Sequence, residues 1–388
     1  MEISACVKYV GVNDHQVDLF EGQYKVPNGM SYNSYVILDE KIAVMDTVDG
    51  FFTEEWLNNV EQVLDGKMPD YLIIQHMEPD HSASIPAFLK KYPKATVVST
   101  AKGFQFMEQF FPEFFAGQGL PAEQRIVAAN DGVLELGQHS LHFVYAPMVH
   151  WPEVMMTYEA TEKILFAADG FGKFGALDVE EEWTDEARRY YIGIVGKYGP
   201  QVQAVLKKAA GLNIQTICSL HGPVLKENLG FYLEKYDNWS SYQPEESGVV
   251  IAYASVYGNT RNAAEYLADV LQEKGQKTVL YDLARCDKAK AVADAFRYDR
   301  LVLAGITYNG DLFPCMRSFI EGLTERNYQN RKVAIIENGT WAPMAGKLIL
   351  GMFEKSKNLT FTETTVSIKS AMNEQNKGEI GKLAEELC

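Results

Sequence analysis

The sequence predicts an α/β protein of two domains, with two helix-covered sheets first and a doubly wound, five-stranded parallel sheet second. A length of 388 residues suits two or three domains at about 150 residues each. Short apolar runs and helical patterns alternate irregularly before residue 245 and regularly after residue 248. The polar stretch 240–248, with a proline and a glycine, is typical of a linker. We therefore expect domains at residues 1–245 and 248–388.

The order of elements supports each half of this prediction. In the first domain, strands are expected at 35–38, 42–45, 71–75, 96–99, 141–145, 164–167 and 214–219, and helices at about 53–64, 85–92, 102–110 and 185–210. Many short strands with interspersed helices indicate two sheets covered by helices. In the second domain, strands at 249–255, 277–283, 301–306, 332–337 and 365–368 alternate with helices at 261–274, 288–296, 315–323, 347–355 and 377–387. This alternation predicts a doubly wound sheet.

Composition excludes several classes of function. Asp and Glu outnumber Lys and Arg by 52 to 36, which argues against a nucleic-acid partner because phosphate binding needs basic surface. The sequence contains no run of 18 apolar residues, so no membrane span is predicted. The N-terminus lacks the pattern of a signal peptide. The five cysteines are scattered and form no CxxC motif, which indicates a reducing cytoplasm and no cysteine-based metal site. Electron chemistry would therefore need other ligands or an organic cofactor.

A dense cluster of potential metal ligands follows the predicted strand at 71–75: His76, Glu78, Asp80 and His81. The alternative is a polar surface turn with an incidental pair of histidines, but only seven histidines occur in the chain. Three further candidates, each just after another predicted strand, are His150, Asp169 and His221. Side chains beyond strand ends meet at one rim of a layered fold, so we expect these seven residues to form one metal site.

The chemistry of this set predicts two metal ions. Seven ligands are too many for one tetrahedral zinc. Asp169 is the natural bridge, because one carboxylate can give an oxygen to each metal. Three carboxylates and four imidazoles without a thiolate favour iron or manganese. The remaining histidines are weaker candidates, and two of them, His139 and His142, are expected to be structural, leaving His15 unassigned.

A phosphate-binding loop is predicted between the first strand and the first helix of the second domain. The loop consists of Ser255, Val256, Tyr257, Gly258, Asn259 and Thr260. Its backbone amides, its hydroxyl groups and the helix dipole can hold one phosphate. The loop lacks the Gly-Lys-Ser/Thr ending of nucleoside triphosphatases and the spaced glycines of dinucleotide sites. It therefore suits a monophosphate such as that of FMN.

Two later loops at the same sheet edge offer groups that could hold a flavin ring. They contain Thr307, Tyr308, Asn309 and Gly310, and Asn338, Gly339, Thr340 and Trp341. Each loop supplies an aromatic side chain for stacking and backbone groups for the polar edge of an isoalloxazine. Ordinary packing is the alternative for Tyr308 and Trp341.

With these motifs the chain resembles a flavodiiron protein of the minimal, two-domain kind over essentially its whole length. The first domain resembles the metallo-β-lactamase fold, an αββα sandwich whose usual H-x-H-x-D-H motif binds zinc. Glu78 replaces the second histidine of that motif, as in the H-x-E-x-D-H pattern of flavodiiron proteins. The second domain resembles short-chain flavodoxin. The resemblance implies FMN and two irons: His76, Glu78 and His150 on the iron nearer the flavin, Asp80, His81 and His221 on the other, and Asp169 between them.

The resemblance also implies an oxidoreductase that reduces dioxygen to water, nitric oxide to nitrous oxide, or both. Electrons would pass from an external donor through FMN to the diiron centre. No rubredoxin-like extension follows Cys388, so we expect the donor to be rubredoxin, a reduced deazaflavin or another flavoprotein. Two sites in one chain would commonly lie too far apart for fast electron transfer, which predicts a head-to-tail homodimer or a dimer of such dimers.

Two other functions stay open at this point. One is a dinuclear zinc hydrolase of the metallo-β-lactamase type with an appended flavodoxin, against which Glu78 argues. The other is a non-enzymatic electron carrier in which the first domain is only a scaffold. The full set of seven ligands argues against it, because a scaffold needs no such cluster.

Overall fold

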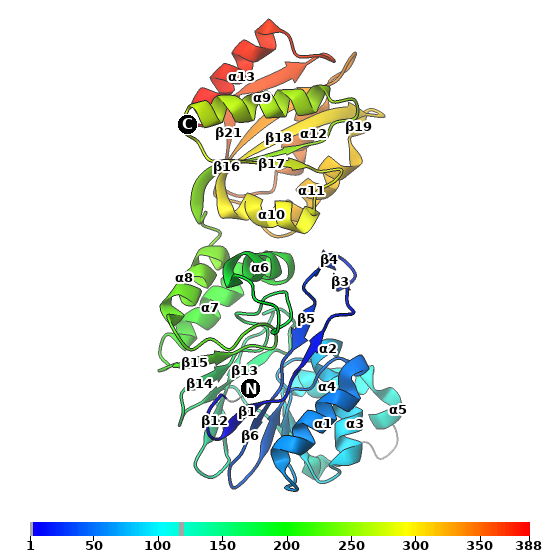
Figure 1. Ribbon diagram of the computed structural model, residues 1–388, viewed down its shortest axis with the longest axis vertical. Helices are drawn as coiled ribbons and strands as arrows, with labels where there is room; N and C mark the ends of the chain where they lie inside the picture. The colour runs from blue at the N-terminus through cyan, green and yellow to red at the C-terminus, as the bar shows by residue number, and fades with distance from the viewer. Residues whose placement is uncertain (1–2, 116–119) are drawn as a thin grey trace. The chain divides into compact units, whose positions relative to one another are not determined.

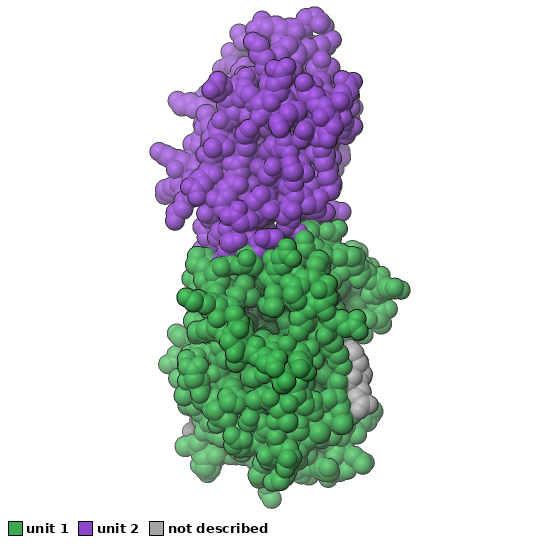
Figure 2. Space-filling view, turned by 90° about the vertical axis from the view of Figure 1, so that its left-hand side faces the viewer, with its two compact units in different colours: residues 1–191, 200–237 green, residues 192–199, 238–388 purple. Residues whose placement is uncertain are grey.

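The computed structural model describes residues 3–115 and 120–388. Its internal contacts divide the chain into two compact units, one of Met1–Tyr191 with Pro200–Asp237 and one of Ile192–Gly199 with Asn238–Cys388. Figure 2 shows the two units in different colours. The predicted linker at 240–248 contains the last residue of helix α8 (Leu229–Ser240) and the first residues of strand β16 (Glu246–Tyr253).

The first unit contains two sheets that face each other. One has the order β1-β6-β7-β8-β9-β10 and the other the order β11-β12-β13-β14-β15. Buried side chains of both sheets, among them Ile73, Val98, Phe143 and Phe166, pack in a single cluster. The bounds are β1 (Val7–Tyr9), β6 (Tyr35–Ile37), β7 (Ala43–Met45), β8 (Tyr71–Ile73), β9 (Thr96–Ser99), β10 (Arg125–Val127), β11 (Val133–Glu135), β12 (Ser140–Tyr145), β13 (Met155–Glu159), β14 (Ile164–Phe166) and β15 (Thr216–Cys218), with two ribbons formed by β2 (Val12–Asp14) and β5 (Met30–Tyr32), and by β3 (Leu19–Phe20) and β4 (Tyr24–Lys25).

Helices cover both sheets, as expected for an αββα sandwich (Figure 1). The first group is η1 (Gly50–Phe52), α1 (Thr53–Leu64), α2 (Pro79–Ser82), α3 (Ile85–Lys91), α4 (Ala101–Phe110), α5 (Pro112–Phe115) and η2 (Ala122–Gln124). Helix α1 buries Trp56, Val60 and Leu64, which recur every four residues on one face. The second group is α6 (Trp183–Tyr190), α7 (Gly199–Ala209) and α8. Between α6 and α7 lie η3 (Tyr191–Val195) and η4 (Gly196–Tyr198), and Ile192–Gly199 belong to the second unit.

Several elements of the first unit differ from the sequence predictions. The single helix expected at 185–210 is wrong, because a π turn and a 3₁₀ turn separate α6 from α7. Gly196, Gly199 and Pro200 lie at this break, and glycine and proline weaken a continuous helix. Strand β13 was not predicted, because the polar residues Thr157 and Glu159 interrupt the apolar pattern of a segment that is buried throughout. Both oxygens of the Glu159 carboxylate accept backbone N–H groups of the next turn.

The second unit is the predicted doubly wound sheet. Its strands have the order β17-β16-β18-β20-β21, and each pair in that order is parallel. This is the strand order of flavodoxin-like folds. The elements are β16, α9 (Asn259–Glu273), β17 (Thr278–Asp282), α10 (Lys288–Arg297), β18 (Tyr298–Tyr308), β19 (Asp311–Leu312), α11 (Pro314–Thr324), β20 (Arg331–Asn338), α12 (Ala345–Met352), β21 (Leu359–Ile368) and α13 (Glu374–Glu386). Among the described residues, no helix is long and apolar enough to cross a membrane.

His139 has the structural role that its sequence context predicts. Its Nδ1 lies 2.8 Å from Asp39 Oδ2 and its Nε2 lies 3.4 Å from Glu162 Oε1, so the ring joins three turns of the first unit. Burial alone would lower the pKa of His139, but the hydrogen bonds to Asp39 and Glu162 outweigh it and raise that pKa. A histidine whose pKa is higher in the folded than in the unfolded protein stabilises the fold. This stabilisation is fully present at a pH below the pKa of the unfolded state, and it is lost as the pH rises through the pKa of the folded state.

We therefore predict that the cost of His139→Gln depends on pH. Thermal unfolding should show a loss of about 2–4 °C in Tm at pH 6 and a smaller loss at pH 9. His142→Gln, on neighbouring strand β12, controls for the loss of an imidazole as such. An equal loss for His139→Gln at both pH values would contradict this role.

Candidate functional site

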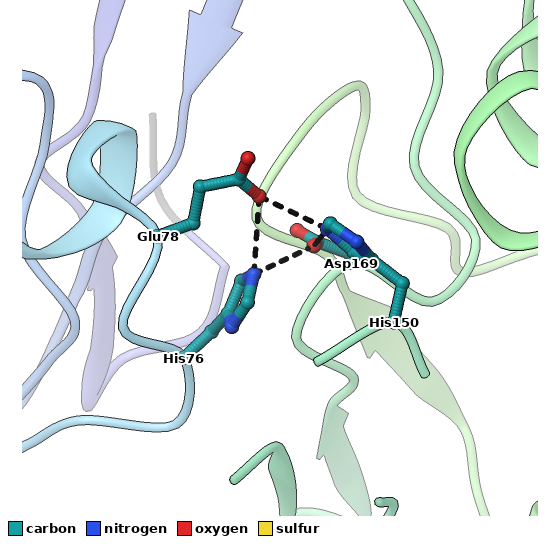
Figure 3. A group of neighbouring side chains, drawn as sticks. All are labelled: His76, Glu78, His150 and Asp169. Carbon is teal, nitrogen blue, oxygen red and sulfur yellow. Dashed lines mark hydrogen bonds and ion pairs between the residues drawn. The ribbon is translucent and has the colours of Figure 1, made fainter. Parts of the chain in front are cut away.

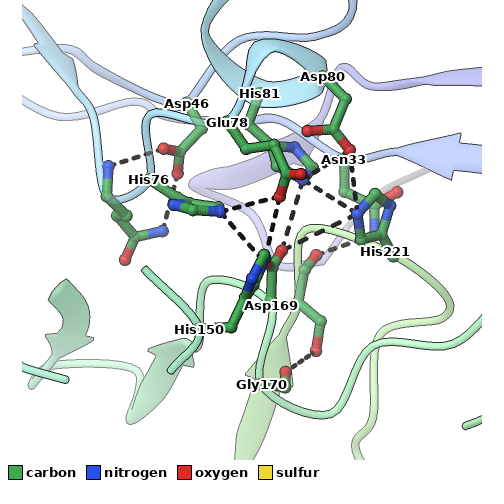
Figure 4. A network of polar contacts seen from close by, with 12 residues as sticks. Asn33, Asp46, His76, Glu78, Asp80, His81, His150, Asp169, Gly170 and His221 are labelled. Carbon is green, nitrogen blue, oxygen red and sulfur yellow. Dashed lines mark hydrogen bonds and ion pairs between the residues drawn. The ribbon is translucent and has the colours of Figure 1, made fainter. Parts of the chain in front are cut away.

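The seven predicted metal ligands come together at one edge of the first unit, as Figure 4 shows. His76 and Glu78 lie in the loop after β8, while Asp80 and His81 belong to the short helix α2. The other three follow β12, β14 and β15, and they are His150, Asp169 and His221. All seven are largely buried, Glu78 being the most exposed, with 15% of its side chain accessible. The ends of four strands thus deliver potential ligands from four separate stretches of chain.

The seven side chains form two groups. Figure 3 shows the first, in which the Nε2 atoms of His76 and His150 lie 3.2 and 2.9 Å from Glu78 Oε2. The same two nitrogen atoms lie 3.3 and 3.2 Å from Asp169 Oδ2. The ligand atoms of this group all lie within 4.8 Å of one another. These spacings are those of groups that converge on one cation.

The second group consists of Asp80, His81 and His221. Asp80 Oδ2 lies 3.3 Å from the Nε2 atoms of both histidines, and these two Nε2 atoms are 3.0 Å apart. Asp169 Oδ1 lies 3.4 Å from His81 Nε2 and 3.9 Å from His221 Nε2. One oxygen of Asp169 therefore faces each group, which is the geometry that a bridging carboxylate requires.

Two carboxylates of this cluster have no hydrogen-bond donor among the described residues. Both carboxylate oxygens of Asp80 and of Asp169 are buried and accept no hydrogen bond from any described residue. Burial alone would raise the pKa of Asp169, but the facing imidazoles, His76 foremost, outweigh it and hold that pKa well below its usual value. Burial would lower the pKa of His150, but the nearby carboxylates of Asp169 and Glu78 outweigh it and raise that pKa to about 9. Hard oxygen donors and imidazoles of this kind fit two cations such as iron.

Surrounding residues hold the histidines in place. His76 Nδ1 donates to Glu153 Oε1 at 2.8 Å, and the same oxygen accepts the N–H of Met77 at 2.9 Å. His221 Nδ1 donates to the carbonyl of Ser31 at 2.7 Å. These bonds leave Nε2 of each ring as the nitrogen that faces the ligand group, and such outer hydrogen bonds fix the tautomer of metal-binding histidines.

Sequence reasoning missed Glu153 and also Glu21. Glu153 lies three residues after His150, but no pattern in the sequence links it to His76. Glu21 lies in the turn between β3 and β4, and desolvation together with the neighbouring Glu78 carboxylate raises its pKa to about 7. Only the folded chain brings these two carboxyl groups to the cluster.

We predict that Glu153→Gln weakens metal binding at the first group. An amide oxygen is a weaker acceptor for His76 Nδ1 than a carboxylate, so the ring becomes less basic and less well oriented. Titration of metal-free protein against a competing chelator should show about a 10–100-fold loss of affinity for one of two irons. Glu135→Gln, on the exposed face of β11, should bind both irons like the wild type. Unchanged affinity in Glu153→Gln would remove this positioning role.

The loops predicted to hold a flavin surround one cavity of about 510 Å³ in the second unit. Residues of all three predicted loops line it, and among the fourteen predicted residues only Gly258 is absent from the lining. A volume of this size is typical of pockets for small molecules and cofactors. Trp341 and Tyr257 are 90% and 92% exposed, so their rings are open to stack on a planar ligand.

The end of this cavity at the start of α9 has the features of an anion-binding site. Gly258, with φ of +92°, precedes the helix, and its N–H donates to Ser255 Oγ at 3.1 Å. Asn338 Nδ2 donates to Thr260 Oγ1 at 3.3 Å, which joins the first loop to the third. A Cβ on Gly339 would lie 2.8 Å from Pro343 Cα, so only glycine fits there. Free backbone amides at a helix N-terminus favour a bound anion.

Comparisons with known proteins agree with this architecture. Residues 30–222 match the ODP family beta lactamase, and residues 250–358 match a flavodoxin domain. The anaerobic nitric oxide reductase flavorubredoxin of Vibrio vulnificus is 28% identical over 86% of this chain and 69% of its own. The flavodiiron protein of Giardia intestinalis is 26% identical, with a TM-score of 0.91 over 100% of this chain and 96% of its own. The rubredoxin oxygen:oxidoreductase of Desulfovibrio gigas, 24% identical, has the same fold, with a TM-score of 0.92 over 100% of this chain and 97% of its own.

Proposed function

We propose, from the premise that this chain is a flavodiiron protein with an ODP-type β-lactamase domain and a flavodoxin domain, that it reduces a diatomic gas. The reaction is the reduction of dioxygen to water, of nitric oxide to nitrous oxide, or both. The observation that carries the proposal is the position of Asp169, whose two oxygens face two separate groups of ligands. The names of the Vibrio and Desulfovibrio relatives, which refer to nitric oxide and to oxygen, support both gases.

Each group of residues has a defined role in this proposal. His76, Glu78 and His150 would hold one iron, and Asp80, His81 and His221 the other, with Asp169 between them. When bound, FMN and the two irons together supply four electrons, enough for one dioxygen, while two electrons suffice to join two nitric oxide molecules. The buried carboxylates offset the positive charge of the metals, and Glu153 and Ser31 keep the His76 and His221 rings aimed at them.

The residues that line the cavity of the second unit would bind FMN. Ser255, Asn259 and Thr260 line this cavity, and their hydroxyl groups with the amides at the start of α9 would hold one phosphate. No lysine lies in this loop to neutralise a polyphosphate. Tyr308 and Trp341 line the same cavity and would stack on the isoalloxazine ring.

Thr260→Asp is therefore predicted to remove the flavin. A carboxylate at the first turn of α9 repels the phosphate and takes its place at the amides. Chromatography of flavin released on denaturation should find FMN in the wild type and in Thr260→Ser, and less than about a tenth of that amount in Thr260→Asp. Stoichiometric FAD in the wild type, or full FMN in Thr260→Asp, would contradict the assignment.

The external donor, the cellular location and the assembly also belong to this proposal. The donor would be rubredoxin, a reduced deazaflavin or another flavoprotein. The five free cysteines support a cytoplasmic location. A head-to-tail homodimer would place each flavin beside the partner's metals. Mixing Asp169→Asn with Thr260→Asp under conditions of subunit exchange should then restore up to half of the wild-type rate, whereas no recovery, or full activity from a monomer, would exclude the dimer.

Metal analysis combined with activity assays tests the function against its alternatives. We expect two irons and one FMN per chain, together with rapid consumption of at least one of the two gases. Two zincs with thioesterase activity would instead indicate a hydrolase. Bound FMN with no turnover of either gas would indicate an electron carrier.

A further inference from the structure

An apolar cavity of about 350 Å³ lies within the first unit, apart from the two sites described above. Strands β13, β14 and β15 form one wall, and helices α7 and α8 form the other. Its lining is mostly aliphatic, with Met156, Leu165, Val205, Leu206, Ile217 and Leu229 as typical members. Phe171, Tyr236 and Asp237 also line it. The exposed residues Ala210 and Leu233 also line it, so the cavity opens to the surface at one side. Pockets of this size are typical of binding sites for small molecules.

The inner end of the cavity reaches the backbone that carries the metal ligands. Two of its lining residues, Val149 and Gly170, are the chain neighbours of His150 and Asp169. A Cβ on Gly170 would lie 3.1 Å from the Cε atom of Met156, which also lines the cavity. Glycine at this position therefore lets the apolar wall approach the Asp169 loop closely. Residues of the cavity wall are thus directly bonded to two of the seven ligands.

The polar groups at the wall are already engaged. The N–H of Phe171 donates to the Tyr236 hydroxyl oxygen at 2.6 Å, and Gln203 Nε2 donates to Asp237 Oδ1 at 2.8 Å. A water molecule needs two to four polar partners to occupy a cavity stably, and an aliphatic wall offers few. Apolar cavities of smaller volume bind xenon and benzene, so this one favours a small, apolar guest.

We propose that this cavity is a binding site for a small, neutral diatomic gas and concentrates it beside the metal ligands. The inference rests on the proposed function, which names dioxygen and nitric oxide as substrates. Both gases are small, uncharged and nearly apolar, so the same aliphatic wall suits either. The cavity supplies the gas and takes no part in the electron transfer itself.

Xenon is a direct probe of this site, because it is an apolar atom with no affinity for the metal ligands. Titration of the whole protein, followed by ¹²⁹Xe NMR, should give a saturable shift for the wild type. Val205→Phe fills the cavity from α7 and should abolish most of that shift, whereas Ala204→Phe, on the exposed face of the same helix, should retain it. No saturable shift in the wild type, or an equal shift in Val205→Phe, would overturn the binding site.

Steady-state kinetics then test the link to the reaction. In Val205→Phe the KM for the dissolved gas should rise about 3–10-fold, while kcat at saturating gas, iron content and FMN content stay at the wild-type level. A smaller filling, Ala209→Leu, should give an intermediate KM and covers the case in which Val205→Phe fails to fold. An unchanged KM in a folded variant that has lost the xenon shift would overturn the supply role alone. A wild type that reduces neither gas would overturn the proposed function and, with it, the supply role. Xenon binding is measured without turnover, so it shows separately whether the cavity binds an apolar guest.

Discussion

Asp169→Asn is expected to remove most of the iron and to lower gas reduction by at least about 100-fold. One oxygen of Asp169 lies 3.2 and 3.3 Å from His150 and His76, and the other lies 3.4 Å from His81. An amide is neutral and offers one good donor oxygen, so it bridges two cations poorly. Iron analysis and gas consumption by the purified variant measure the effect.

The loss should be confined to the metal site. FMN content in Asp169→Asn should stay close to the wild type, because the flavin cavity belongs to the other unit. Asp65→Asn, at the exposed C-terminal end of α1, makes the same chemical change away from the site and should leave iron and activity unaltered. Unchanged iron stoichiometry in Asp169→Asn would remove Asp169 from the bridge.

Glu78→His is expected to shift the first group of ligands from iron toward zinc. Glu78 Oε2 lies within 3.2 Å of the Nε2 atoms of both His76 and His150, so this carboxylate is the hard donor of that group. An imidazole in its place gives a neutral, softer set that suits zinc. Metal analysis should find zinc replacing about one of two irons, and gas reduction should fall about 100-fold while FMN content is unchanged.

Glu78→Asp is the matched variant for this experiment. It keeps a carboxylate at the same position and should retain more iron than Glu78→His. If Glu78→His were to keep two irons and full turnover, the account of metal preference would be wrong.

The candidate site could be predicted largely because its residues follow strand ends. Runs of apolar residues located β8 in one sheet and β12, β14 and β15 in the other. Strand pairing carries the ends of β12, β14 and β15 to one edge of their sheet, and the packing of the two sheets brings the end of β8 beside them. Any His, Asp or Glu just beyond such an end is then a candidate, which identified all seven residues of the cluster. The regular alternation after residue 248 predicted the second sheet and its three loops for the same reason.

The residues that sequence reasoning missed depend on contacts between distant parts of the chain. Glu153 acts on His76 across 77 positions, and Asp46, also missed, accepts the N–H and side-chain amide of Gln75 across 29 positions. Helix α8 was also not predicted from the sequence. The cavity beneath α7 and α8 could not be predicted either, since no sequence pattern indicates where packing leaves a space.

The most direct test of the central claim is to count electrons and products in a single turnover. The protein is reduced anaerobically, mixed with limiting dioxygen or nitric oxide in separate experiments, and the products are analysed. The proposal predicts rapid reoxidation by at least one gas, with water as the product from dioxygen or one nitrous oxide for every two nitric oxide molecules. Slow reoxidation by both gases, with hydrogen peroxide as the product from dioxygen and no nitrous oxide from nitric oxide, would contradict it.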